Sequence, residues 1–268
     1  LNKKFFIPYG RQYIDKKDID SVKKSLKQKL ITTGSSVKLF ESAIEKKFNS
    51  KYAYTCINAT AGLHLAYLSV NLKKNDVIVM PAINFIAAYR IADLMEAKIY
   101  LADVDPNTGQ VTPKTIEECI KKNNLKKIKI LLTMYLGGYA VDNIGFYKLK
   151  KKYKCVLIED ACHALGSKYK HNNKNYHVGS CKHSDLCVFS FHPVKPITTG
   201  EGGAITTNNK SFAKKISLLR SHGILRNKDY WDYDIKELGF NYRLSDLNCS
   251  LGLSQLNKLD KFNLKRKE

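Results

Sequence analysis

Several features that define common protein classes are scarce or absent in this 268-residue sequence. Only six of its 46 basic residues are arginine, and the lysines are spread along the chain. The formal net charge of +22 is therefore more typical of a solvated surface than of an Arg-based nucleic-acid interface. No apolar run approaches the roughly 20 residues of a membrane-spanning helix. No G-x-G-x-x-G or G-x-x-x-x-G-K-[ST] motif occurs, which disfavours a Rossmann dehydrogenase and a P-loop kinase.

Cysteine pairing also has little support. The seven cysteines are an odd number, lie in apolar segments and form no C-x-x-C pair. A disulfide framework is therefore disfavoured, and we expect a reducing, cytoplasmic compartment, in keeping with an N-terminus that lacks an apolar signal core. Cys181, His183, Cys187 and His192 are close in sequence, but their spacing fits no common zinc pattern, so we expect no metal.

The sequence does contain a regular alternation of strand-like and helix-like segments. Hydrophobic residues make up 44% of the chain, which suits a globular protein with a sizeable core. Short apolar runs predict strands at Val77–Met80, Ile99–Val104, Ile130–Met134, Val156–Glu159, Leu186–Phe191 and Gly203–Thr207. This alternation predicts an α/β fold with a mostly parallel central sheet and helices on both faces.

Helical spacing occupies segments between the predicted strands. Three apolar faces follow this spacing: Ile19, Val22 and Leu26; Leu63, Ala66, Tyr67 and Val70; and Phe212, Ile216 and Leu219. Thr112 before Pro113 predicts a helix start, and Gly223 predicts a helix end. We expect residues 245–261 to form a helix that turns Leu247, Leu251 and Leu259 inward, and the charge run after it to lead into a longer chain.

Two segments place polar residues where a phosphate could bind. Residues 58–65 put small and hydroxyl side chains at the start of a predicted helix, whose free N–H groups and positive dipole end suit a phosphate. The alternative is an ordinary N-cap formed by Asn58 or Thr60. In residues 238–245, Asn241 and Arg243 raise the same pair of possibilities, a phosphate contact or a helix cap.

In residues 156–166 an apolar strand runs directly into acidic residues. Ligands of open α/β sheets bind at the carboxyl ends of the strands, and Asp160 at that position could pair with a pyridinium nitrogen and keep it protonated. Asp160 could equally cap the following helix. His163 could hydrogen-bond a ring oxygen of a cofactor or could be a core histidine.

The most specific segment is 189–203, in which Ser190 ends a strand and Lys195 lies between Pro193 and Pro196. The prolines restrict the backbone on both sides, so the lysine is held at a rigid turn. A lysine can form a Schiff base with an aldehyde cofactor, and the glycines that follow let backbone approach closely. Together the four segments predict a pyridoxal phosphate (PLP) enzyme.

In residues 163–167, 189–203, 218–223 and 251–256 the sequence resembles the DegT/StrS-type nucleotide-sugar aminotransferases, a branch of the fold-type I PLP enzymes. The likeness runs over nearly the whole chain. It implies a substrate-contacting segment at residues 1–35 and a fold-type I PLP-binding large domain at 36–245. Residues 246–268 would begin a linking helix to a small C-terminal domain that we expect beyond this sequence.

The resemblance also assigns roles to single residues. Lys195 would bond to the cofactor aldehyde and shuttle the proton, Asp160 would pair with the pyridine nitrogen, and His163 would contact the ring oxygen. Further cofactor contacts are implied for Thr60, Ala61, Phe85, Ser190 and Asn241, with Phe85 stacked on the ring and Asn241 reaching the cofactor of a neighbouring subunit. Substrate contacts are implied for Tyr9, Lys29, Leu30, Ile31, Thr32, Ala59, Ser190 and Asn241. The chain departs from many relatives in having Asn-Ala-Thr-Ala-Gly at 58–62 and Asn84 before the stacking aromatic.

The reaction that the resemblance implies moves an amino group from glutamate to the 4-keto carbon of a UDP-linked 4-keto-6-deoxy-N-acetylhexosamine, a step of pseudaminic acid biosynthesis. The implied enzyme is a homodimer with shared active sites and has no nucleic-acid or membrane partner. Amination of a perosamine or bacillosamine precursor is an alternative. Sugar dehydration is another, although dehydratase relatives carry His where Lys195 stands. A third alternative is a protein that is not an enzyme, either a cofactor-binding regulator or a basic DNA-binding protein.

Overall fold

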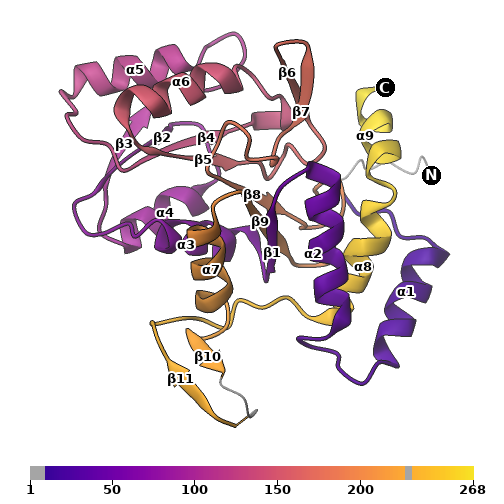
Figure 1. Ribbon diagram of the computed structural model, residues 1–268. Coiled ribbons are helices and arrows are strands. Elements are labelled where there is room, and N and C mark those ends of the chain that lie inside the picture. The colour runs from indigo at the N-terminus through magenta and orange to yellow at the C-terminus, as the bar shows by residue number, and fades with distance from the viewer. Residues whose placement is uncertain (1–9, 227–230) are drawn as a thin grey trace, which may run out of the picture.

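The part of the chain that the computed structural model describes, residues 10–226 and 231–268, is built around one seven-stranded sheet (Figure 1). The strand order is β1-β9-β8-β5-β4-β2-β3, and β9 alone in this sheet runs antiparallel to its neighbours. The predicted α/β fold with a mostly parallel sheet is confirmed. The strands of the sheet are β1 (Tyr52–Cys56), β2 (Val77–Pro81), β3 (Lys98–Ala102), β4 (Ile130–Met134), β5 (Val156–Asp160), β8 (Leu186–Ser190) and β9 (Gly203–Thr207).

The six strands predicted from apolar runs all form, with ends that differ by up to two residues. Three features were missed because their sequences are not apolar runs. Strand β1 reads Tyr-Ala-Tyr-Thr-Cys and is only partly buried at the sheet edge. The other two are the hairpins β6 (Lys168–His171) with β7 (Lys174–His177), and β10 (Ile224–Arg226) with β11 (Tyr233–Ile235).

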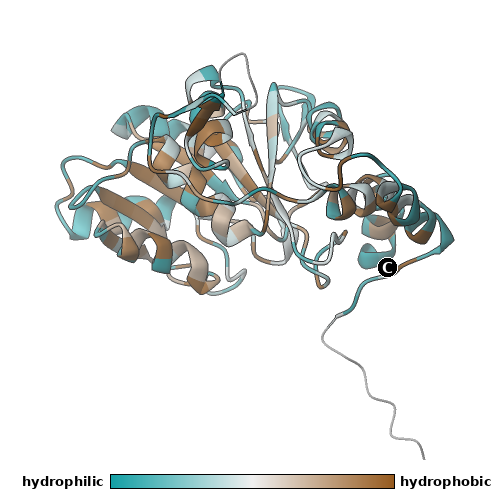
Figure 2. Ribbon diagram, turned by 90° about the horizontal axis from the view of Figure 1, so that it is seen from below, coloured by the Kyte–Doolittle hydropathy of each residue, from teal (hydrophilic) through white to brown (hydrophobic). Residues whose placement is uncertain are grey.

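Helices cover both faces of the sheet, as predicted (Figure 1). One face of the sheet is covered by α3, α4 and α7, which share an apolar cluster with the strands. The opposite face is covered by α5 and α6 in one cluster and by α2 and α8 in another. Figure 2 shows apolar strands at the centre and polar residues on the outer helix surfaces. The helices are α1 (Lys16–Leu26), α2 (Ser35–Phe48), α3 (Ala59–Ser69), α4 (Ile86–Leu94), α5 (Pro113–Lys122), α6 (Asn143–Tyr153), α7 (Lys210–Leu219), α8 (Asp246–Leu256) and α9 (Leu259–Lys267), with a 3-10 turn η1 at Leu136–Gly138.

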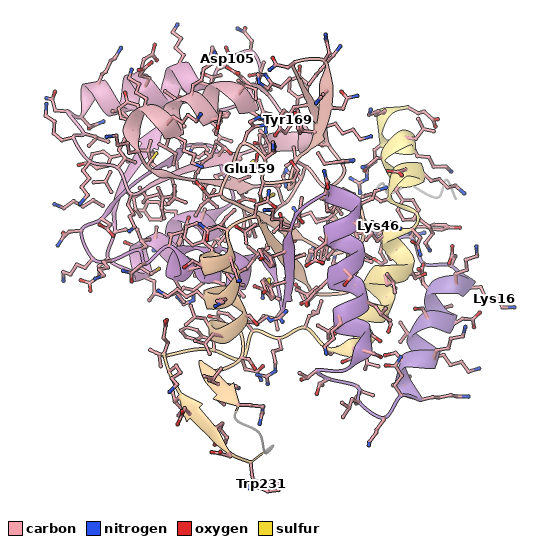
Figure 3. All side chains as sticks on the ribbon, viewed as in Figure 1. Lys16, Lys46, Asp105, Glu159, Tyr169 and Trp231 are labelled. Atoms are coloured by element: carbon pink, nitrogen blue, oxygen red, sulfur yellow. The ribbon has the colours of Figure 1, made fainter. Side chains whose placement is uncertain are left out.

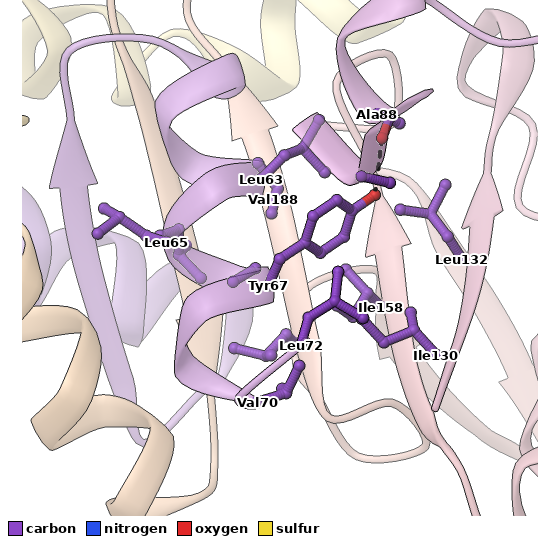
Figure 4. Packing of buried hydrophobic residues seen from close by; sticks show 14 of the residues in the cluster. Leu63, Leu65, Tyr67, Val70, Leu72, Ala88, Ile130, Leu132, Ile158 and Val188 are labelled. Atoms are coloured by element: carbon purple, nitrogen blue, oxygen red, sulfur yellow. Dashed lines mark hydrogen bonds between the residues drawn. The ribbon is translucent and has the colours of Figure 1, made fainter. Parts of the chain in front are cut away.

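Tyr67 of α3 lies at the centre of the first cluster (Figure 4). Its ring is fully buried among strand residues such as Ile130 and Ile158, and its hydroxyl donates to the Ala88 carbonyl of α4 over 3.2 Å. Burial of a side chain of this kind contributes about 2–3 kcal/mol. The contact therefore fixes α3, and with it the N-terminus of that helix, against the sheet.

The helix predicted around Ile19 forms as α1, but its predicted buried face is wrong. Ile19 and Leu26 are 60% and 59% exposed, while Asp18 and Ser25 are buried. Asp18 replaces the apolar contact with polar ones, because its carboxylate accepts hydrogen bonds from side chains of α8 and the residues after it. The apolar spacing identified the helix correctly but not the side that packs.

Of the other helix signals, the cap of α5 by Thr112 is confirmed. Helix α7 ends earlier than predicted, at Leu219 with Arg220 as its C-cap, and Gly223, with φ of 67°, follows three residues after that cap. The helix predicted at residues 245–261 begins at its Ser245 cap but breaks after Leu256, and α9 starts at Leu259. Leu259 is buried as expected, whereas Leu247 and Leu251 are only partly buried.

All seven cysteines carry free thiols, and all but Cys162 are buried. Burial raises the pKa of four of them to about 12: Cys56, Cys155, Cys181 and Cys249. None of the helices in residues 10–226 and 231–268 has the length and apolar character of a membrane span.

Asp246 joins the start of α8 to the start of α2. Its buried carboxylate accepts the N–H groups of Gly34 and Ser36 over 2.7 and 2.8 Å. We predict that Asp246→Ala lowers the free energy of unfolding by about 2 kcal/mol, because two N–H groups lose their acceptor in a site with little water. Urea unfolding measures this loss. Asp246→Asn keeps one acceptor oxygen and should lose less, and equal stability of the alanine variant and the native chain would contradict the assignment.

Candidate active site

The carboxyl ends of the parallel strands β2, β4, β5 and β8 meet at one edge of the sheet. Asp160 ends β5 and lies in register with Val188 of β8, two residues before Ser190. Because side chains alternate along a strand, Asp160 and Ser190 both point to the face covered by α3. The fold therefore brings the predicted acid and the predicted hydroxyl to one place, at the edge where ligands of such sheets bind.

Asp160 is a buried acid with few partners. Burial raises the pKa of its carboxyl, while the thiol and N–H of Cys162 and the nearby Lys195 amine lower it. The N–H of Cys162 lies 3.2 Å from its Oδ1 atom. A buried carboxylate of this kind gains from a cationic group placed against it. Both predicted residues follow strands that end at this edge, Asp160 at the end of β5 and Lys195 on the turn after β8.

Lys195 lies on the turn that follows β8. The turn is closed by the Lys195 N–H, which donates to the His192 carbonyl over 2.8 Å, and by the Thr199 N–H, which donates to the Phe191 carbonyl over 3.0 Å. The lysine is half-buried and lines two adjoining cavities of about 360 and 190 Å³. A half-buried amine that faces a cavity of this size is accessible to a small molecule.

His163 faces the same cavity as Lys195. Its Nδ1 atom accepts the N–H of Gly137 over 3.3 Å. Burial and the positive charge of Lys195 both lower the pKa of the ring. The neutral ring is thereby favoured, and the proton then resides on Nε2 because Nδ1 is an acceptor. His163 presents one N–H donor, and it is not a core histidine.

The N-terminus of α3 lies beside the end of β8. Gly203 pairs with Ser190, and a Cβ atom at Gly203 would lie 2.9 Å from the backbone nitrogen of Ala59, so only glycine allows this approach. The Asn58 side chain caps the helix by accepting the Ala61 N–H over 2.8 Å. The earlier N–H groups, those of Ala59 and Thr60, have no partner inside the helix. The N-terminus of α3 therefore lies next to Ser190, and free helix N–H groups of this kind can bind an anion.

Other predicted site residues lie further from Lys195. Phe85 follows β2 at the same sheet edge, but its ring is 69% exposed. Asn241 is exposed and pairs with Ser221, and it does not line either cavity. The exposed segment 29–32 is tied to the start of α8, because Thr32 pairs with Ser245. Tyr9 lies outside the described residues.

The sequence analysis missed three parts of the cavity wall: Leu136, Gly137 and Arg266. The glycine pair after the apolar run 130–134 was an available signal, since a chain reversal at the end of a strand needs residues that tolerate positive φ, and Gly137 and Gly138 have φ of 65° and 87°. Arg266 donates to the Lys195 carbonyl over 3.2 Å, but in the sequence it is one cation within a charge run.

Curated relatives match the chain over nearly its full length. A transaminase of Campylobacter jejuni subsp. jejuni serotype O:23/36 (strain 81-176), named for UDP-4-amino-4,6-dideoxy-N-acetyl-β-L-altrosamine, is 44% identical over 262 residues. The match covers 98% of this chain and 67% of that protein. The same-named protein of serotype O:2 (strain ATCC 700819 / NCTC 11168) is 42% identical over equal shares. The chain thus spans about two thirds of the length of these relatives.

Solved structures agree with this fold. Helicobacter pylori PseC, an aminotransferase of pseudaminic acid biosynthesis, superposes with a TM-score of 0.86 at 31% identity, over 95% of this chain and 66% of that one. A Streptococcus pneumoniae protein described as a sugar aminotransferase, in its PLP-form, gives 0.87 at 26% identity, over 98% and 69%. Residues 12–268 match the DegT/DnrJ/EryC1/StrS aminotransferase family, and the chain belongs to that family.

Proposed function

We propose that this chain is the large part of a PLP-dependent aminotransferase that moves an amino group from glutamate to the 4-keto carbon of a UDP-linked 4-keto-6-deoxy-N-acetylhexosamine. The observation that carries the proposal is the position of Lys195, which faces a cavity with His163 and lies on the turn after β8, the strand that pairs with β5 and its buried last residue, Asp160. These three side chains come from two neighbouring strand ends, as the resemblance requires.

The residues at this edge of the sheet fit pyridoxal phosphate. The larger cavity, at about 360 Å³, is in the range of small-molecule sites. The N-terminus of α3 and Ser190 would hold a phosphate, and the buried Asp160 carboxylate would pair with a protonated ring nitrogen. The Nε2–H of His163 would donate to the ring oxygen. Each polar part of the cofactor has a complementary group among the residues of this edge.

PLP, when bound, supplies an aldehyde carbon and an electron-withdrawing ring through which an amino group passes between substrates. Lys195 Nζ would bond to that aldehyde and, when free, would take the proton from Cα of the amino donor and return it as an acid. Asp160 would keep the ring nitrogen charged by electrostatic attraction. The turn that holds Lys195 fixes the position of its Cα, so that only the side chain has to move during the proton transfer.

The sugar substrate is proposed from the relatives. The name of the Campylobacter jejuni transaminases specifies an amino group at carbon 4 of a 4,6-dideoxy N-acetyl sugar linked to UDP. An amino group delivered by transamination replaces a keto group, so the acceptor would carry a 4-keto group. The net charge of +22 would help to attract the negatively charged diphosphate.

The remaining assignments also belong to the proposal. Lys29–Thr32, Ala59 and Tyr9 would contact the sugar nucleotide. Phe85 is exposed and follows a strand that ends at the site edge, so its ring would be free to stack on the cofactor. Asn241 lies away from the cavities of its own chain, which is consistent with a contact to the cofactor of a second copy. The domain limits at residues 35 and 245 are proposed on the same resemblance.

We predict that Lys195→Ala lowers the transamination rate by at least about 10³-fold, because the variant lacks both the amine that bonds to the cofactor and the base. Turnover is measured with glutamate and the keto-sugar nucleotide. Borohydride should fix no cofactor to the variant. Lys210→Ala, which removes an exposed lysine of α7, is the matched control and should behave as the native protein. Near-native turnover of Lys195→Ala would refute the role.

Asp160→Asn should lower the same rate by about 10²–10³-fold, because the neutral amide does not stabilise positive charge on the ring nitrogen. Borohydride should still fix the cofactor, since Lys195 is intact, and this separates loss of rate from loss of binding. Asp93→Asn, an exposed position on α4, serves as the control. A rate for Asp160→Asn within a few-fold of the native rate would contradict the pairing.

The sugar itself is tested with a panel of keto-sugar nucleotides and glutamate. We expect kcat/KM for the UDP-linked pseudaminic acid precursor to exceed that for a GDP-linked perosamine precursor by at least about 10²-fold. The bacillosamine precursor, which also carries UDP, should lie between them. A GDP-linked substrate that reacts fastest would replace the proposed substrate while leaving the aminotransferase chemistry in place.

A further inference from the structure

Glu159 is a second buried acid at the end of β5, next to Asp160 in sequence but on the opposite face of the sheet. Figure 3 labels it near the middle of the molecule. The proposed chemistry gives it no role. A buried carboxylate is costly unless donors satisfy it, so its surroundings require an explanation.

Three side chains donate to this carboxylate. The Tyr135 hydroxyl lies 2.7 Å and the Asn143 amide nitrogen 3.1 Å from Oε1, while the Ser184 hydroxyl lies 2.9 Å from Oε2. Asn143 also donates to the Tyr135 hydroxyl over 2.6 Å. Burial raises the pKa of Glu159, and these donors, with the Gly179 backbone, act against that rise. The two oxygens therefore hold different parts of the chain: Oε1 holds the residue after β4, and Oε2 holds the loop before β8.

Tyr135 begins the turn that contacts His163. Its carbonyl accepts the Gly138 N–H over 2.9 Å, and the Gly137 N–H between them donates to Nδ1 of His163. The turn fits closely against the His163 backbone, because a Cβ atom at Gly138 would lie 2.5 Å from the His163 carbonyl oxygen. The Ser167 hydroxyl donates to the Gly138 carbonyl over 2.6 Å. A shift of Tyr135 would therefore move the N–H group that orients the His163 ring.

We propose that Glu159 and Tyr135 are positioning residues for His163: the Glu159 carboxylate holds the Tyr135 hydroxyl, and the turn that Tyr135 begins keeps an N–H group on Nδ1, so that the ring carries its proton on Nε2. The inference rests on the proposed function only where it takes the cofactor ring oxygen as the acceptor of the Nε2–H group. The position of the proton is a property of the protein itself. It also gives the buried acid beside Asp160 a role.

The two oxygens of Glu159 provide a matched pair of variants. Tyr135→Phe removes the hydroxyl on Oε1 and loosens the turn against His163. Ser184→Ala removes the hydroxyl on Oε2, which comes from the loop before β8 and not from that turn. Each deletes one hydrogen bond to the same carboxylate, and Tyr135→Phe also deletes the bond that the Tyr135 hydroxyl accepts from Asn143. A purely structural role predicts a loss of stability in both variants but no selective change at His163. Glu159→Gln is a third variant that keeps the shape of the side chain and removes its charge.

The measurement is the tautomer of His163, read from the ¹⁵N shifts of its ring in histidine-labelled protein, with and without PLP. The His163→Gln variant identifies its signals among the seven histidines. We expect the native protein and Ser184→Ala to show the Nε2–H form. In Tyr135→Phe and Glu159→Gln, the ratio of Nε2–H to Nδ1–H should fall about five-fold, the effect of weakening one hydrogen bond. Thermal unfolding checks that each variant is folded.

Unchanged His163 shifts in Tyr135→Phe, or equal changes in Tyr135→Phe and Ser184→Ala, would overturn the inference. Should Glu159→Gln fail to fold, the two single-hydroxyl variants still decide the question. The readout in the protein without PLP requires no substrate or turnover. If the native protein does not catalyse transamination, the selective change in the His163 tautomer can still be observed. If the tautomer does not change, transamination by the native protein is unaffected.

Discussion

The placement of the buried Asp160 carboxylate and of the turn that carries Lys195 at one edge of the sheet is the constraint on which the site depends. It joins two neighbouring strand ends, β5 and β8, at the edge where the parallel strands of the sheet finish. Burial by itself would disfavour the charged acid, and the amine offsets part of that cost. A cofactor with a cationic ring nitrogen would give the acid a second partner in the same place. The N-terminus of α3 lies next to the end of β8, the Lys195 turn follows β8, and His163 follows β5.

Much of this arrangement could be predicted from the sequence. Apolar runs identified six strands, and the step from apolar to acidic residues at 159–160 identified the site edge. The resemblance then named the lysine. Buried, continuous strands are readily recognised because nothing but the core determines their composition. The resemblance assigned Lys195 and Asp160 to one cofactor, and the strands that precede them, β8 and β5, do end at the same edge of the sheet.

The parts that could not be predicted depend on contacts between distant segments. Asp18 is buried because α8 supplies polar partners some 240 residues later in the chain, and helical periodicity contains no information about them. Glu159 and Asp160 form an acidic pair in the sequence, yet only the pleat of β5 reveals that they serve opposite faces. The break between α8 and α9 has no glycine or proline to announce it. The roles proposed for Phe85 and Asn241 involve a cofactor and a second subunit, and not contacts within one chain.

The burial of the cysteines has a consequence for how the protein responds to oxidants and alkylating reagents. The thiolate is the reactive species, and a thiol with a pKa of about 12 is ionised to roughly one part in 30,000 at pH 7.5. Such thiols are inert while the core is closed and react once it opens. The labelling rates of Cys56 in β1 and Cys249 in α8 therefore report how often the structure opens transiently around these two elements. No additional probe has to be introduced.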